Sequence, residues 1–184
     1  NMIGDEFIHT ERTTPERFEL QRLFREMADA GCTHVVMEVS SHSLVLNRVA
    51  GIHFAVGAFT NLTQDHLDFH HTMQAYAEAK SKLFTVCGVG CINADDAWSG
   101  VMMKDAECKL LRYSADGKEA ELTASSIKFM PSAVEFHAQF KGESADVRLA
   151  IPGKFSVYNA LNTIAIGLAL GVSLADCAEA MKSA

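Results

Sequence analysis

The stretch TNLTQDHLDFHHTMQAYAEAKSKLF, residues 60–84, follows the apolar run FAVGAF at 54–59, which is typical of a buried strand. It begins with a polar loop that contains three histidines and two aspartates, and it ends in a helical segment that contains Lys80 and Lys82. In open α/β sheets, ligands bind at the carboxyl ends of the strands. Imidazole and carboxylate groups just after a strand therefore indicate a metal or phosphate site at that edge.

A second apolar run, residues 34–39, predicts another buried strand upstream of the first. Glu38 interrupts this run, and a buried carboxylate has to be paired, protonated or bound to a cation. Before this strand, Thr13 and Thr14 are expected to cap a helix with Pro15 in its first turn. An alternation of helices and strands predicts βαβ units, and hence an α/β fold with a mostly parallel sheet flanked by helices.

The same patterns predict the remaining elements. Residues 1–10 are expected to form a short hairpin around Gly4 and Asp5. Beyond residue 107 the segments become short and alternating, which predicts antiparallel hairpins and a small antiparallel β subregion. These segments are 108–113, 121–130, 133–141 and 145–151; the other expected elements are strands at 54–60 and 88–93, and helices at 43–48, 72–85, 155–170 and from 173 onward.

Composition and charge narrow the class of protein. The chain has 184 residues with a hydrophobic content of 48%, which is enough for one well-packed domain. The net charge of −7 argues against nucleic acid as the main partner, and no apolar run is long enough to span a membrane. Five scattered cysteines are expected to be free thiols in a reducing cytosol.

The residue types around the loop allow metal chemistry. Glu38 and His66 offer a carboxylate oxygen and an imidazole nitrogen, which suit a hard or borderline divalent ion. The alternative is that Glu38 caps a helix and His66 bonds a loop carbonyl. Lys80 either extends its amine to water along an apolar helix face or, near a metal, loses its proton and adds carbon dioxide to form a carbamate.

Other polar residues are candidates for binding. Ser40 precedes Ser41 and His42 but lacks the flanking glycines of a nucleophile elbow, so binding is preferred over nucleophilic catalysis. Thr13 and Thr14 suit an anion at a helix start as well as they suit capping. Arg48 suits a carboxylate or phosphate, or else a solvated surface position. Two asparagines near a later helix start suit hydrogen bonds to a base edge, or capping: Asn159 and Asn162.

Several motifs, in order and at consistent spacing, resemble the central domain of the Mur ligases. They are THVVMEVSSHSL, FTNLTQDHLDFH, AYAEAKSKLF, INADD and GKFSVYNALNTIAIGLALG. The sequences of the first two motifs are most similar to the MurE type, and the resemblance extends over nearly the whole chain. It implies a P-loop-type α/β domain of a cytoplasmic, ATP-dependent ligase of peptidoglycan synthesis.

The resemblance also implies a reaction. ATP phosphorylates the free carboxylate of UDP-N-acetylmuramoyl-L-alanyl-D-glutamate, and the amine of the third amino acid, diaminopimelate or L-lysine, attacks the acyl phosphate. Magnesium ions offset the negative charge of the phosphates. The residues implied are Glu38 and His66 as magnesium ligands, Lys80 as a carbamylated catalytic lysine that also serves a magnesium ion, Thr13, Thr14, Ser40 and Arg48 for the UDP-muramoyl-dipeptide, and Asn159 and Asn162 for adenine.

The sequence departs from the family pattern in two ways. Position 46 is Leu where some members have a substrate-binding Gln, and the chain contains no Gly-x-x-Gly-Lys-Thr phosphate loop. We therefore expect residues 1–184 to be a central domain without the start of the P-loop region, the N-terminal UDP-binding domain or the C-terminal amino-acid-binding domain. Such a domain is expected not to ligate alone.

Two other functions remain open from the sequence. One is another ligase of the same fold, such as a folylpolyglutamate or cyanophycin synthetase, which flanking sequence would distinguish. The other is a non-catalytic binding module that retained the domain and lost the phosphate loop. The residues do not indicate an oligomeric state.

Overall fold

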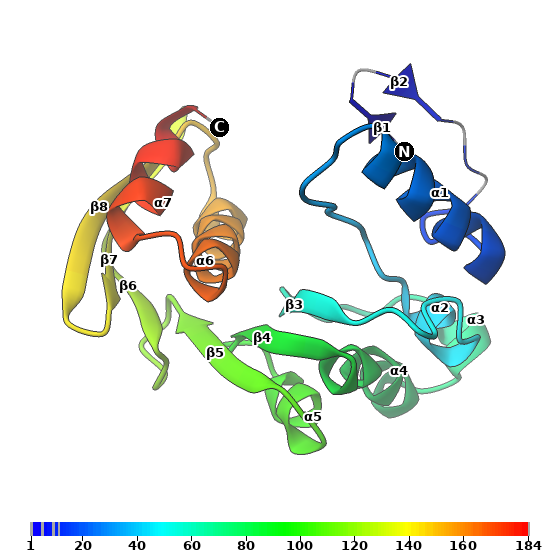
Figure 1. Cartoon of the computed structure of the whole chain (residues 1–184). Helices are drawn as coiled ribbons and strands as arrows, with labels where there is room; N and C mark the ends of the chain where they lie inside the picture. The colour runs from blue at the N-terminus through cyan, green and yellow to red at the C-terminus, as the bar shows by residue number, and fades with distance from the viewer. Residues whose placement is uncertain (1, 5, 9, 11, 184) are drawn as a thin grey trace.

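A six-stranded sheet forms the centre of the molecule in the computed structural model, which describes residues 2–4, 6–8, 10 and 12–183. The strands lie in chain order: the first four run parallel, and the fourth also begins an antiparallel meander with the last two (Figure 1). They are β3 (Phe54–Phe59), β4 (Cys87–Asn93), β5 (Lys109–Ser114), β6 (Leu122–Met130), β7 (Ala133–Phe140) and β8 (Glu143–Leu149). The predicted α/β class and antiparallel subregion are confirmed.

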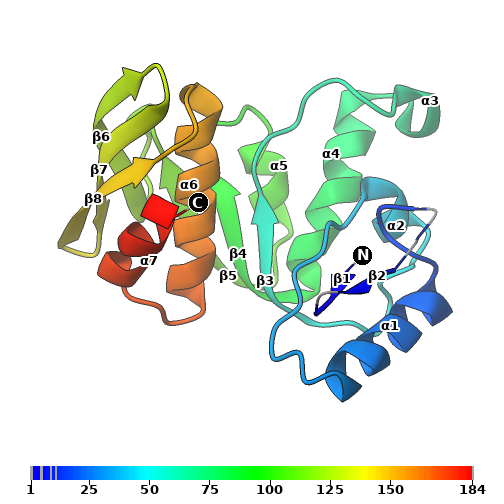
Figure 2. The same cartoon turned by 90° about the horizontal axis from the view of Figure 1, so that it is seen from above.

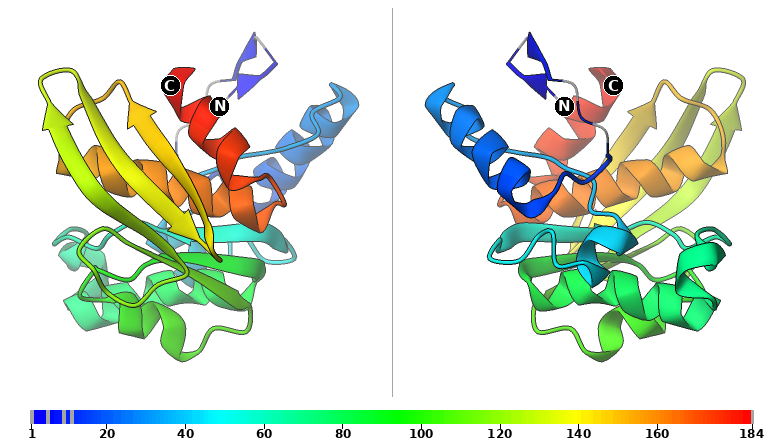
Figure 3. Two further views of the ribbon diagram at one scale, coloured as in Figure 1. Left: turned by 90° about the vertical axis from the view of Figure 1, so that its left-hand side faces the viewer. Right: turned by 90° about the vertical axis from the view of Figure 1, so that its right-hand side faces the viewer.

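Helices cover both faces of this sheet (Figure 3). On one face, α6 (Lys154–Ala169) and α7 (Leu174–Ala180) pack against β3 to β8 around Leu161 and Ile164. On the other face, α4 (Met73–Ser81), the 3-10 turn η1 (Lys82–Thr85) and α5 (Ser99–Lys104) pack against β3 and β4. The helices predicted at 72–85, 155–170 and from 173 onward are confirmed.

Strand β4 is buried on both faces. Cys91 joins the cluster under α6, whereas Ile92 joins the cluster over α4, as alternating side chains of a central strand do. Gly90 is required here because a Cβ at this position would lie 2.7 Å from Cδ1 of Phe84. The glycine lets η1 pack directly on the strand.

The N-terminal part lies beside β3, on the side away from β4 (Figure 2). It contains the hairpin β1 (Met2–Ile3) and β2 (Glu6–Phe7), then α1 (Arg17–Asp29) and α2 (Ser41–Val45). The pairing of β1 with β2 confirms the predicted hairpin, of which Asn1, Asp5 and His9 lie outside the described residues. Helix α2 begins two residues before the predicted start at 43, and α1 and α2 share a small apolar cluster.

Three sequence predictions were wrong. Residues 34–39 are not a buried strand: they belong to no sheet of the described chain, and Val36 is 98% exposed. Strand β5 is not part of an antiparallel hairpin but pairs parallel with both β4 and β6. Helix α1 has Glu16 rather than a threonine at its N-cap, so Pro15 precedes the helix. In the described part of the chain, no helix is long and apolar enough to cross a membrane.

Candidate functional site at the carboxyl edge of the parallel strands

The loop after β3 is tightly folded and includes the short helix α3 (Leu67–His70). His66, its N-cap, has a φ of 54°, and His71, its C-cap, has a φ of 64°. Left-handed backbone is costly for residues with a Cβ and persists where the surrounding structure fixes it. The backbone N–H of His66 donates to Oδ1 of Asp65 at 2.7 Å, and the N–H groups of Phe69 and His70 donate to the carbonyl of His66. The backbone at His66 is therefore held in place after β3.

His70 ties this loop to two helices. Its side chain is only 6% exposed, and Nε2 lies 2.8 Å from Oγ of Ser41 at the start of α2. Its ring stacks on Tyr76 of α4 at a centroid distance of 4.9 Å, and the His42 ring lies 5.4 Å away. Burial lowers the pKa of His70, and the neighbouring His42 adds to the effect. His70 is thus a neutral, structural imidazole.

Lys80 lies in the middle of this site. It lines a cavity of about 70 Å³ together with Val39, Phe59 and Thr60, and its Nζ lies 5.4 Å from the centroid of the Tyr76 ring. Burial lowers the pKa of Lys80, while the carboxylates of Glu38 and Asp65 raise it to a smaller extent. A lysine with a lowered pKa has a larger neutral fraction, which is the form that adds carbon dioxide.

Glu38, His66 and Lys80 are brought to the same region of the molecule. The charge of Glu38 acts on both Lys80 and Tyr76, and the His66 ring lies 5.9 Å from the Tyr76 ring. Asp65, which the sequence analysis did not assign, acts on the same two groups. Among the described residues, however, no three His, Cys, Asp or Glu side chains form a ready metal site.

The donor set fits Mg²⁺ in its chemistry. Two carboxylates, from Glu38 and Asp65, act on the amine of Lys80, and carboxylate oxygen is the ligand that this ion prefers. His66 is about half exposed, with Nε2 3.5 Å from Oδ2 of Asp65, so a ligand can reach its ring. A carbamate on Lys80 would add two further oxygens to this side of the cavity.

Thr14 connects α1 to the segment before α2. It is 1% exposed, its hydroxyl donates to the carbonyl of Glu38 at 2.9 Å, and it accepts from the N–H of Ser40 at 3.0 Å. This hydroxyl therefore holds the extended segment rather than capping α1. Thr13, its neighbour, is exposed and is free to meet a ligand from solvent.

Ser40 and Arg48 lie next to Thr14. The hydroxyl of Ser40 accepts from the N–H of Ser43 and so caps α2. The Arg48 guanidinium lies 3.1 Å from Glu16 and donates to the carbonyl of Thr14 at 3.4 Å. Its Nε is buried with no partner in the described chain, so the arginine is a held group rather than a solvated surface residue.

The two asparagines predicted for the nucleotide lie inside α6. Because Gly153 is the N-cap of this helix, the capping alternative for Asn159 and Asn162 is wrong. Asn159 is exposed on the helix. Asn162 is half buried, and its Oδ1 has no hydrogen-bond partner among the described residues.

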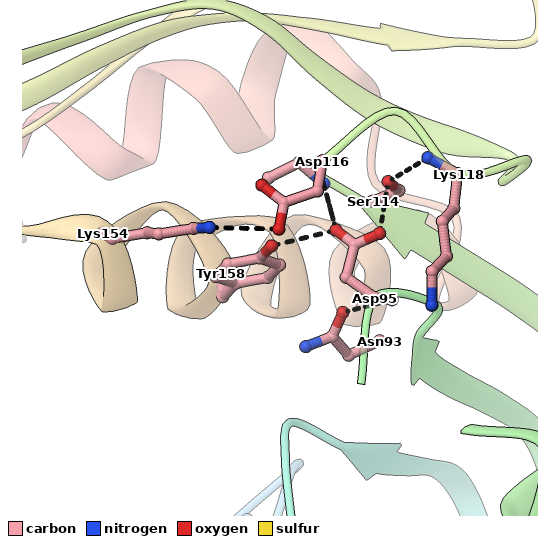
Figure 4. Close-up of polar contacts among 8 residues, drawn as sticks. Asn93, Asp95, Ser114, Asp116, Lys118, Lys154 and Tyr158 are labelled. Carbon is pink, nitrogen blue, oxygen red and sulfur yellow. Dashed lines mark hydrogen bonds and ion pairs between the residues drawn. The ribbon is translucent and has the colours of Figure 1, made fainter. Parts of the chain in front are cut away.

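Sequence reasoning left one cluster unassigned (Figure 4). Asp95 follows β4, and its carboxylate accepts from the hydroxyl of Ser114 at 2.8 Å and from the hydroxyl of Tyr158 on α6 at 3.0 Å. It also accepts from the backbone N–H groups of Ala115 at 2.8 Å and Asp116 at 3.0 Å. The only sequence signal was the polar run at 93–96 just after a strand, which does not reveal partners so far along the chain.

Comparison with known proteins defines the class. Residues 1–167 match the family model of the Mur ligase middle domain, so the chain belongs to this family.

The particular relatives are ligases of one kind. The chain is 46% identical, over 99% of its length, to the UDP-N-acetylmuramoyl-L-alanyl-D-glutamate–2,6-diaminopimelate ligase of Caldanaerobacter subterraneus subsp. tengcongensis. It is 45% identical, over 95% of its length, to the ligase of the same name from Clostridium tetani. The chain spans 38% and 36%, respectively, of the length of these two relatives.

Solved structures agree with this assignment. A UDP-N-acetylmuramoyl-L-alanyl-D-glutamate–2,6-diaminopimelate ligase superposes with a TM-score of 0.87 at 29% identity, over 94% of this chain and 37% of that one. MurF from Acinetobacter baumannii superposes with a TM-score of 0.65 at 25% identity, over 71% of this chain and 29% of that one. The first similarity covers almost the whole chain, including both the parallel and the antiparallel parts of the sheet.

Proposed function

We propose that the chain is the central domain of a cytoplasmic, ATP-dependent ligase of peptidoglycan synthesis. The ligase adds diaminopimelate to UDP-N-acetylmuramoyl-L-alanyl-D-glutamate. The observation that supports this most directly is the convergence of Glu38, Asp65 and His66 on a partly buried Lys80 at the carboxyl edge of a Mur-type sheet. The choice of diaminopimelate over L-lysine rests on the names of the relatives.

The reaction has two steps. The carboxylate of the D-glutamyl residue attacks the γ-phosphorus of ATP, the bond to the β-phosphate oxygen breaks, and ADP leaves. The amine of the incoming amino acid then attacks the acyl carbon, loses a proton, and the phosphate leaves to give an amide. Magnesium supplies charge stabilisation for the phosphate oxygens during phosphoryl transfer. Phosphoryl transfer depends on positioning and electrostatics, and the polar edge of this sheet provides both.

Lys80 acts as a carbamate in this proposal. Its neutral amine attacks carbon dioxide, a C–N bond forms, and one proton is released. The product is an anion in place of a cation at the cavity wall, so Lys80, with Glu38 and His66, would hold a magnesium ion when one is bound. The burial that lowers the pKa of Lys80 favours the reactive form.

The substrates occupy two sides of the sheet edge. Thr13, Arg48 and the Ser40–Thr14 pair lie together next to the metal side and hold the UDP-muramoyl-dipeptide. The adenine lies on the side of α6, where Asn162 has an unpaired oxygen and Asn159 is open to solvent. The phosphate-binding loop and the pockets for uridine and for the amino acid belong to other parts of the ligase.

Two measurements test this function in the full-length ligase that contains this chain. The first is ATP-dependent addition of diaminopimelate or L-lysine to the UDP-muramoyl-dipeptide. The second is the carbamate signal of Lys80 in ¹³C NMR after incubation with labelled bicarbonate. Lys80→Ala and Lys80→Arg should lose the signal and reduce kcat on the order of a hundredfold, the scale of lost transition-state electrostatics.

Lys82→Ala is the matched control, because Lys82 lies one half-turn away on the same segment and is exposed. This variant should retain both the labelled carbamate and the activity. Absence of ligation by the wild-type enzyme would overturn the proposed function, whereas ligation without a labelled carbamate would overturn only the role of Lys80.

A further inference from the structure

The carboxylate of Asp95 accepts four hydrogen bonds. Its four donors come from two different regions: the turn after β5 and the first half of α6 (Figure 4). Burial raises the pKa of Asp95, but the hydrogen bonds from Ala115, Ser114, Asp116 and Tyr158 outweigh this and leave the pKa below its usual value. The group is therefore an anion that accepts from several donors at once, and it is unsuited to proton transfer.

Further contacts attach the start of α6 to the segments that follow β4 and β5. Lys154, in the first turn of α6, forms an ion pair with Asp116 at 3.0 Å. Lys118 donates from its backbone to Ser114 at 3.0 Å and from Nζ to the carbonyl of Ala94 at 2.9 Å. The start of α6 is thus attached to the segment after β4 and to the turn after β5 by side chains rather than by a helix cap, since Gly153 provides none.

The segment after β4, residues 93–96, also contacts the loop after β3. Asn93 donates from Nδ2 to the carbonyl of Thr60 at 2.7 Å, and its Oδ1 accepts from the N–H of Asp95 at 3.0 Å. Asp96 accepts from the N–H of Leu62 at 3.1 Å. A continuous set of hydrogen bonds therefore runs from the loop that contains His66, through residues 93–96, to Tyr158 on α6.

We propose that Asp95 is a positioning residue for the nucleotide. It fixes α6, and with it Asn159 and Asn162, relative to the metal side of the same site. Asp95 acts through Tyr158, whose neighbour in the chain is Asn159, and it touches neither ATP nor the reacting atoms. This inference rests on the proposed function, because it assigns α6 to the adenine side of the ATP site.

The test uses the full-length ligase with Asp95→Asn, Tyr158→Phe and the double variant. Loss of a hydrogen bond to a charged group should raise the Kd and KM for ATP about tenfold in Asp95→Asn. The KM values for the UDP-muramoyl-dipeptide and for the amino acid should change less than about twofold, because their contacts lie on the other side of the site. Tyr158→Phe removes a single hydroxyl, retains the ring, and should show the same pattern in weaker form.

The double variant tests whether Asp95 affects ATP binding through Tyr158. If Asp95 acts through Tyr158, the effects on ATP binding are not additive, and the double variant resembles Asp95→Asn alone. Asp146→Asn is the matched control, since it neutralises a 93%-exposed carboxylate on β8 whose partner is His137. This control should leave all three KM values unchanged.

Two results would overturn the inference. One is an unchanged affinity for ATP in both Asp95→Asn and Tyr158→Phe. The other is an equal rise in all three KM values, which would mean that Asp95 supports the fold as a whole. Because every comparison is made against a wild-type enzyme that ligates, an inactive wild type would instead count against the proposed function.

Discussion

At the scale of the residue, His70 predicts a pH dependence of stability. Its pKa is lowered in the folded state by burial, below the usual value of 6.5. As the pH falls below 6.5, the unfolded chain takes up a proton that the folded chain does not, so the free energy of unfolding should decrease. The decrease should stop once the pH is below the folded-state pKa. Urea denaturation at a series of pH values measures it.

His70→Gln isolates this effect, because the amide keeps a hydrogen-bonding group near Ser41 and does not titrate. The slope of stability against pH should be smaller in this variant than in the wild type over the same range. His137→Gln is the control, since His137 lies at the surface of the antiparallel meander beside Asp146. An equal slope in the wild type and in His70→Gln would show that other groups cause the dependence.

At the scale of the element, substitutions in the extended segment at 34–39 are expected to have little effect on the stability of the protein. Val36 is 98% exposed in a segment without strand partners in the described chain, so Val36→Ala should change the free energy of unfolding by less than about 0.5 kcal/mol. Val134 of β7 is fully buried, and the same truncation there should cost about 2 kcal/mol. Chemical denaturation of the 184-residue chain compares the two variants.

This pair also tests why the strand prediction failed. An apolar run has strand propensity, but a strand forms only where a neighbouring strand provides hydrogen bonds, and residues 34–39 pair with no strand of the described chain. A similar loss of stability in Val36→Ala and Val134→Ala would mean that the segment packs as a strand in solution.

At the scale of the whole molecule, the chain should bind ATP weakly or not at all. It contains the residues that we propose for the adenine and metal sides, but its sequence contains no Gly-x-x-Gly-Lys-Thr loop to hold the phosphates. Isothermal titration with ATP and magnesium should show no saturable binding in the micromolar range, and no ligation should be detected. A micromolar affinity of the 184-residue chain for ATP would contradict this and show that other residues bind the phosphates.

The sequence alone determined the order of most helices and strands, the Mur ligase family, and the stretch that contains Lys80 and His66. These follow from patterns within a few residues: apolar periodicity, turn residues and contiguous motifs. It could also place polar residues after strands, because parallel strands end at a common edge.

Only the tertiary structure decided which distant groups meet. The hydroxyl of Thr14 forms hydrogen bonds with the backbone of Glu38 and Ser40, and the side chain of His70 lies within hydrogen-bond distance of Ser41. Asp95 accepts a hydrogen bond from Tyr158, which lies 63 positions further along the chain. The same holds for the parallel pairing of β5 and for the unpaired segment at 34–39. The physical reason is that propensity and capping act locally, whereas pairing, burial and hydrogen bonds between elements depend on the path of the whole chain.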